Sequence, residues 1–98
     1  MPAYWIAHVT VTDPQRYAGY QATAPAAFAR HGAVFLARGG EGEVVEGAPF
    51  DRHVLIRFPD LAAARACYAS PEYTAARAQR DGACKAHVTL VDGLPSVR

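Results

Sequence analysis

The sequence predicts an α+β fold in which one four-stranded antiparallel sheet carries helices on one face. Three helix starts of the same kind support this prediction, at residues 12–14, 58–60 and 70–72. At each of them an Asp or Ser side chain can accept a hydrogen bond from the first free N–H groups of a helix, and Pro is tolerated in the first turn. The first two starts follow strand-like apolar runs, so the elements follow the order β-α-β-β-α-β.

The size and composition of the chain exclude several classes of function. The chain has 98 residues, of which 51% are hydrophobic, and we expect one domain over residues 1–98. The formal net charge is +1 without blocks of like charge, which argues against nucleic acid or a membrane surface as the partner. Two cysteines, Cys67 and Cys84, are too few for a disulfide-rich scaffold. We expect no signal peptide at the start of the sequence, and no apolar run is long enough to span a membrane. These features predict a cytoplasmic protein with reduced thiols.

The N-terminal part is predicted to form a strand and a helix. Residues 3–11 are rich in aromatic and β-branched residues and predict the first strand. A helix then runs from Asp13-Pro14 to Gly32, since glycine suits the left-handed backbone at a helix end. One face of this helix is formed by residues that recur every three or four positions, namely Tyr17, Tyr20, Ala24, Phe28 and His31. Pro25 removes one backbone hydrogen bond, so we expect a kink or a division near residues 23–24.

The rest of the chain completes the sheet. Gly39-Gly40 indicates a bulge or a sharp bend, and residues 43–46 read as a further extended piece. The other predicted elements are strands at 33–38, 52–58 and 85–92, and a helix from Pro59-Asp60 through Tyr68 that restarts at Ser70-Pro71 and ends at residues 81–82. The tail at residues 93–98 is expected to be loose or to lie over a partner. This order predicts the ferredoxin-like plait (βαββαβ) with strand order 4-1-3-2.

The sheet face without helices is predicted to be an interface. If that face met water, its strands would alternate cleanly between apolar and polar residues. Instead it mixes apolar with polar side chains, namely Tyr4, Ile6, Leu55 and Val91 with His8, Thr10, His53, Arg57, His87 and Thr89. We therefore expect a homodimer that buries this face. The candidate interface residues are Tyr4, Ile6, His53, Leu55, Arg57 and His87.

Several sequence segments together resemble one uncharacterised bacterial family, domain of unknown function 1330. These segments are residues 2–6, 35–40, 45–47, 58–59, 62–66 and 70–73. The resemblance implies a dimeric α+β barrel, in which two plaits place their sheets face to face. The wider superfamily includes cofactor-free monooxygenases, lactone isomerases and haem-degrading enzymes, as well as proteins without known activity. The family carries no established reaction, so no catalytic role is transferred to any residue.

Three histidines are predicted to lie close together. His8 lies toward the end of the first strand, while His53 and His87 lie near the starts of the two strands that flank it in antiparallel orientation. Such a cluster could bind a metal or haem, or move protons near neutral pH. The alternative is a set of polar residues at a dimer interface, and the absence of metal-ligand motifs favours it. No metal site and no cofactor are predicted.

The candidates for ligand binding are Tyr20, His31, Arg38 and His8. In barrels of the resembled superfamily the small-molecule cavity lies between sheet and helices, where Tyr20 and His31 could line it. The alternatives are an ordinary core position for Tyr20 and an interaction of His31 with the helix dipole. Arg38 precedes two glycines and could grip a carboxylate or phosphate, or it could pair with Glu41, Glu43 or Glu46. His8 is a candidate acid–base group.

The sequence contains no specific catalytic motif, and we retain three functions. The first is a homodimer that binds, or also transforms, a small apolar or aromatic compound with an anionic group. The second is a structural or association dimer without turnover. The third, implied by the resemblance, is an enzyme similar to cofactor-free monooxygenases or isomerases. An RNA-binding plait is rejected because residues 52–58 lack the glycine and the paired aromatics of RNA-binding strands.

Overall fold

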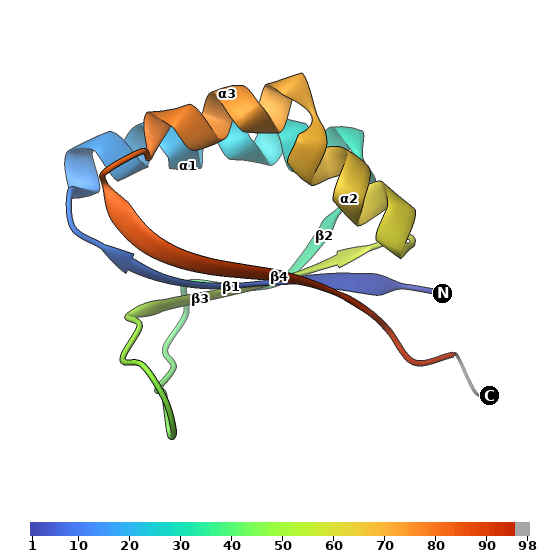
Figure 1. The fold of residues 1–98 in the computed structure, drawn as a ribbon, viewed down its shortest axis with the longest axis horizontal. Coiled ribbons are helices and arrows are strands. Elements are labelled where there is room, and N and C mark those ends of the chain that lie inside the picture. Colours follow the sequence, from blue (N-terminus) through green and yellow to red (C-terminus); the bar gives the residue numbers. More distant parts are fainter. Residues whose placement is uncertain (96–98) are drawn as a thin grey trace.

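A computed structural model describes residues 1–95 and contains seven elements of secondary structure. They are β1 (Ala3–Val11), α1 (Pro14–Arg30), β2 (Val34–Arg38), β3 (Arg52–Phe58), α2 (Leu61–Ala69), α3 (Pro71–Gln79) and β4 (Cys84–Asp92). One antiparallel sheet has the strand order β2-β3-β1-β4, and the helices cover one of its faces (Figure 1). The predicted ferredoxin-like plait and its strand order are confirmed. Of the predicted tail, residues 96–98 lie outside the described part of the chain.

Strand β1 lies inside the sheet and shows why the two faces differ. Its odd-numbered residues from Ala3 to Val9 are buried under the helices, and its even-numbered residues lie on the other face. Antiparallel pairing extends this alternation to both neighbours, because directly paired residues share a face. His8, for example, pairs with His53 on β3 and with His87 on β4. We call the face toward the helices the helix face and the other one the open face.

Trp5 forms the centre of the core. Its side chain is 1% exposed, and its ring packs edge-on against Phe28 and Tyr73 and stacks against Phe58. Aromatic pairs of this geometry contribute beyond the apolar area that they bury. Since β1, β3, α1 and α3 each supply one of these rings, the cluster holds the helix layer on the sheet.

The three helices begin where the sequence predicts. Asp13, Asp60 and Ser70 each accept a hydrogen bond from a backbone N–H of the first turn, at 3.2, 2.7 and 3.1 Å. Ser70 also ends α2, because its hydroxyl donates to the carbonyl of Cys67 at 2.7 Å. One buried serine therefore separates α2 from α3. Within residues 1–95, no helix combines the length and the apolar composition that a membrane span requires.

The structure defines two predicted segments more closely and contradicts a third. α1 continues through Pro25 as one helix, so the division is absent and the kink stays a prediction. In β2 the register shifts between Phe35 and Ala37, so the bulge precedes the glycines instead of falling on them. Gly39 turns the chain with a φ of +70°, which is the sharp bend that the two glycines predicted. Residues 43–46 form no strand, since the loop leaves the sheet on the side of the open face and finds no strand to pair with (Figure 1).

Candidate functional site

A cavity of about 510 Å³ lies between the helix face of the sheet and α1. Its walls are largely apolar and aromatic. The apolar wall consists of Trp5, Ala7, Val9, Ala24, Pro25, Phe28, Phe35, Val54, Ile56, Ala86 and Val88. A volume of this size is within the range of small-molecule sites, and such walls suit an apolar or aromatic ligand.

Three arginines give this cavity a positive charge. Arg38 on β2, Arg52 on β3 and Arg80 at the end of α3 all line it, and no Asp, Glu or His is among its described lining residues. Across residues 1–95, the one ion pair within 4.0 Å joins Arg30 to Glu72, so none of the three lining arginines has a carboxylate partner there. Guanidinium groups beside an apolar cavity, without carboxylates to neutralise them, are suited to an anion.

Arg38 makes none of the ion pairs that the sequence left open. Its guanidinium lies over the ring of Phe35, 4.1 Å from the ring centre, and the described residues contain no ion pair between Arg38 and the glutamates of the β2–β3 loop. Arg38 pairs in register with Val54, which also lines the cavity. The side chain of Arg38 therefore belongs to the helix face and borders the cavity.

Arg52 and Arg80 lie at one end of the cavity, the charged end, whereas Arg38 lies over Phe35, in the same set of paired residues across the sheet as Trp5. Arg52 on β3 is directly paired with Val9 on β1, and we call such a set of paired residues across the sheet a row. Trp5 lies four residues before Val9 on β1. At about 3.3 Å per residue, these two rows are on the order of 13 Å apart. Arg80 reaches the charged end, since its guanidinium donates to the sulfur of Cys84 at 3.6 Å, at the start of β4. A ligand with an anionic group at one end and an aromatic ring at the other fits this arrangement.

Gly39 makes room for Arg52. A Cβ atom built on Gly39 would overlap the Arg52 guanidinium, and the φ of +70° strains any residue with a side chain. The N–H of Gly39 donates to the carbonyl of His53 at 3.0 Å, which fixes this turn against the start of β3. The Nε atom of Arg52 is buried and has no hydrogen-bond partner among the described residues. The glycine thus allows the guanidinium of Arg52 to lie beside the cavity.

Tyr17 and Tyr20 add phenolic hydroxyl groups to the lining from α1. Burial raises the pKa of Tyr17, and the charge of Arg52 opposes this in part. Burial, followed by the neighbouring Tyr73, raises the pKa of Tyr20 above its usual range. The hydroxyl oxygens of Tyr20 and Tyr73 lie 2.9 Å apart, and the Arg80 guanidinium lies 5.1 Å from the Tyr20 ring centre. Both lining tyrosines therefore stay protonated near neutral pH and can donate hydrogen bonds.

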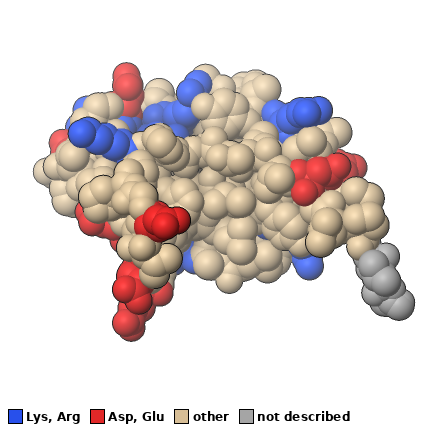
Figure 2. All heavy atoms as spheres, turned by 60° about the horizontal axis from the view of Figure 1, so that its bottom comes forward, with Lys and Arg blue, Asp and Glu red and all other residues tan. Residues whose placement is uncertain are grey.

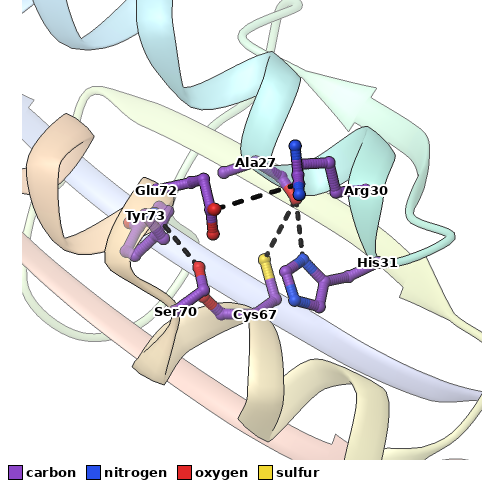
Figure 3. Close-up of polar contacts among 7 residues, drawn as sticks. All are labelled: Ala27, Arg30, His31, Cys67, Ser70, Glu72 and Tyr73. Atoms are coloured by element: carbon purple, nitrogen blue, oxygen red, sulfur yellow. Dashed lines mark hydrogen bonds and ion pairs between the residues drawn. The ribbon is translucent and has the colours of Figure 1, made fainter.

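His31 lies at the end of α1 and is not among the described residues that line the cavity. Its Nδ1 atom is 2.9 Å from the carbonyl oxygen of Ala27, so Nδ1 carries the proton and donates. Figure 3 shows the thiol of Cys67 directed at the same carbonyl, at 3.8 Å. Both groups satisfy a carbonyl in the last turn of α1, which has no partner within the helix. This contact corresponds to the helix-end role that the sequence offered as the alternative for His31.

Cys67 is expected to be much less reactive than Cys84 in the folded protein. Its side chain is 0% exposed, and burial, with a smaller contribution from Glu72, raises the pKa of its thiol to about 11. Because the thiolate is the reactive form, iodoacetamide at pH 8 should modify Cys84 at least about tenfold faster. Peptide mass spectrometry measures both rates, and equal rates would contradict the burial of Cys67.

The stability that the buried Cys67 thiol contributes to the fold is present below the ordinary thiol pKa of 9.0 and is lost as pH rises toward 11.

His8, His53 and His87 lie side by side on the open face, as the predicted register requires. The Nδ1 atoms of His8 and His53 are 2.9 Å apart, so one ring donates and the other accepts. Phe50 packs against His8 and His87, with ring centres 6.1 and 4.9 Å away. Within residues 1–95, no group of three His, Cys, Asp or Glu is arranged to hold a metal ion. The histidines thus form a row within the face for which the sequence predicts an interface.

The cavity brings together two of the four ligand candidates, Tyr20 and Arg38. His31 contacts the end of α1 instead, and His8 lies on the opposite face of the sheet. All interface candidates share the open face, namely Tyr4, Ile6, His53, Leu55, Arg57 and His87.

Sequence reasoning missed Arg52 and Arg80. A signal for Arg52 is present, because the alternation of β3 backward from the buried Phe58 places residues 56, 54 and 52 on the helix face. A charged side chain at such a position indicates a site. Arg80 carries no such signal, since it follows the last turn of α3 and its direction depends on how that helix packs.

Known structures share this fold at low sequence identity. A protein of unknown function from Rhodopseudomonas palustris is 18% identical, with a TM-score of 0.77 over 97% of this chain and 84% of its own. SnoaB, a cofactor-independent oxygenase from Streptomyces nogalater, is 18% identical, with a TM-score of 0.64 over 98% and 96%. A dimeric protein of unknown function and ferredoxin-like fold from Bacteroides fragilis is 12% identical, with a TM-score of 0.64 over 94% and 96%. At these identities the likeness shows the fold.

The family assignment comes from the sequence. No curated protein matches the chain at a significant level. The model of one protein family, described as Domain of unknown function (DUF1330), matches residues 2–94. This match spans nearly all of the 98 residues and confirms the resemblance that the sequence segments carry. The chain therefore belongs to the family Domain of unknown function (DUF1330).

Proposed function

We propose that this protein binds a small aromatic or apolar compound that carries an anionic group, in the cavity between the sheet and α1. The observation that carries the proposal is the set of cavity-lining arginines, Arg38, Arg52 and Arg80, which have no carboxylate partner among the described residues. Apolar walls supply affinity by burying the ring of the ligand, and the guanidinium groups select its charge. A purely apolar ligand would leave these cations without a partner.

We propose further that the protein is a homodimer formed through the open face. Three apolar side chains, those of Val34, Leu36 and Val91, are 46%, 49% and 43% exposed on the sheet. Figure 2, which turns the open face forward, shows few charged residues at the centre and acidic side chains gathered on the protruding β2–β3 loop. An interface centre is typically depleted of charge in this way. The protein from Bacteroides fragilis that shares the fold is described as dimeric.

The ligand proposal is tested by calorimetric titration with 4-nitrobenzoate and with its uncharged analogue 4-nitrobenzamide. We expect 4-nitrobenzoate to bind more tightly to the wild-type protein. Arg52→Met should then raise the dissociation constant of 4-nitrobenzoate about tenfold to a hundredfold, because a hydrogen bond to a charged group contributes about 1.5–3 kcal/mol. The matched control is Arg30→Met, which removes the same charge from an exposed residue of α1 that does not line the cavity.

Two results would contradict the ligand proposal. One is equal affinity for the charged and the uncharged probe, which would mean that the arginines do not select an anion. The other is an equal loss of affinity in Arg52→Met and Arg30→Met, which would indicate a general charge effect. If no aromatic anion binds at all, the association dimer without turnover becomes the better description.

A second candidate function is catalysis of the cofactor-free oxygenase kind. It is favoured by the similarity of fold to SnoaB, which covers 98% of this chain, and by the hydrogen-bond donors at the charged end of the cavity. Groups of that kind stabilise negative charge that develops on a substrate oxygen. Oxygen uptake with dihydroxylated aromatic compounds and no added cofactor tests this candidate. Binding without oxygen uptake would leave the binding function alone.

A further inference from the structure

The charged groups that line the cavity are all hydrogen-bond donors. Guanidinium groups have no acceptor atom, and three of them line the cavity, from Arg38, Arg52 and Arg80, with Arg52 and Arg80 at the charged end. Burial keeps the phenols of Tyr17 and Tyr20 protonated, so they offer O–H groups. A negatively charged oxygen satisfies the cationic groups, while the acceptors in the lining are the hydroxyl oxygens of Tyr17 and Tyr20 and the amide oxygen of Gln21.

The cavity lining also lacks a proton acceptor of the usual kinds. From β1 and β4 only apolar side chains line it, and no Asp, Glu or His is present among the described lining residues. A ligand that loses a proton on binding must therefore release it to solvent. The cavity allows this, because Arg38 is an exposed residue at its border.

We propose that the cavity binds weak oxygen acids, phenols or enols, as their conjugate bases. This inference rests on the proposed ligand site and deepens it, because it names a class of ligand that is neutral in water near neutral pH. On binding, the O–H bond of the ligand breaks, its electron pair stays on the oxygen, and the proton passes to the buffer. Nearby cations favour the charged form of an acid, and burial opposes it. Here the cations of Arg52 and Arg80 lie at the end that receives the ligand oxygen, and N–H groups of their guanidinium groups can donate to it.

The orientation of the ligand follows from the two ends of the cavity. Its oxyanion lies in the row of Arg52, and its ring points toward Trp5 and Phe28. Since these rows are on the order of 13 Å apart, one ring or two fused rings fit between them. The site would then select acids whose hydroxyl group is attached directly to a ring or to a short conjugated system.

The test uses 4-nitrophenol, whose conjugate base absorbs visible light. The wild-type protein is titrated with it in buffers about one pH unit below the ionisation midpoint of the free phenol. We expect the absorbance of the phenolate to rise on binding. Calorimetry in two buffers of different ionisation enthalpy should show proton release, about 0.4 per ligand for a midpoint shift of about one pH unit and up to about 0.9 for a larger shift. The bound midpoint should lie at least one pH unit below the free one, which means that the phenolate binds at least about tenfold more tightly than the phenol.

The outcomes separate this inference from the ligand proposal itself. Binding of 4-nitrobenzoate without ionisation of 4-nitrophenol, or without any binding of the phenol, overturns the inference and leaves the anion site standing. Failure of both probes to bind overturns both. Arg52→Met should reduce the shift of the midpoint, and Arg30→Met should leave it unchanged. An equal midpoint in wild type and Arg52→Met would also overturn the assigned role of Arg52.

Discussion

Leu55→Asp is expected to convert the proposed homodimer into a folded monomer. Leu55 lies on the open face and pairs with Ile6 on β1 and with Ala37 on β2. In a dimer formed through this face, the substitution would bury one uncompensated carboxylate from each copy. A buried charge without a partner costs about 3–5 kcal/mol, so the dissociation constant of the dimer should rise more than about a hundredfold. Analytical ultracentrifugation over a dilution series measures this change.

The control for Leu55→Asp is Ala62→Asp. Ala62 is exposed on α2, on the other side of the sheet, so it receives the same charge outside the proposed interface and should leave the dimer intact. Circular dichroism establishes that both variants fold. A folded Leu55→Asp protein with the dissociation constant of the wild type would show that the open face is not the interface.

Trp5→Ala is expected to lower the free energy of unfolding by about 3–5 kcal/mol, the usual cost of removing a large aromatic core residue. Trp5 is 1% exposed and contacts rings from α1, α3 and β3, so its loss leaves a void that no single neighbour can fill. Urea unfolding followed by circular dichroism measures the change.

The control for Trp5→Ala is Val45→Ala, which truncates an apolar side chain that is 87% exposed. Its free energy of unfolding should stay within about 0.5 kcal/mol of the wild type. A loss of less than about 1 kcal/mol in Trp5→Ala would contradict the central position of this residue in the core.

The fold could be predicted because its signals are local. The alternation in β1 and the capping residues Asp13, Asp60 and Ser70 act within a few residues of where they stand, and the structure contains each of them as expected. The structure of the β2–β3 loop was not predicted correctly, because the sequence at residues 43–46 was interpreted as an extended piece. A strand also needs a neighbouring strand to pair with, and this loop leaves the sheet.

The candidate site was predicted only in part, because it depends on tertiary packing. Tyr20 was found from helical spacing and Arg38 from the glycines that follow it. The glycine at position 39 turned out to accommodate Arg52, a residue that lies thirteen positions further along the chain. Arg80 joins the cavity because α3 packs on α1, a relation that no short sequence segment contains. The charge of the cavity therefore emerges from three separate elements, which only the folded chain brings together.

The central claim is that the cavity holds an aromatic anion with its charge toward the arginines. A crystal structure with 4-bromobenzoate tests it directly, because the anomalous signal of bromine locates one end of the ligand. We predict a bromine peak beside Trp5 and Phe28, with the carboxylate within hydrogen-bond distance of Arg52. A bromine peak at the arginine end, or a ligand bound only outside the cavity, would contradict the claim.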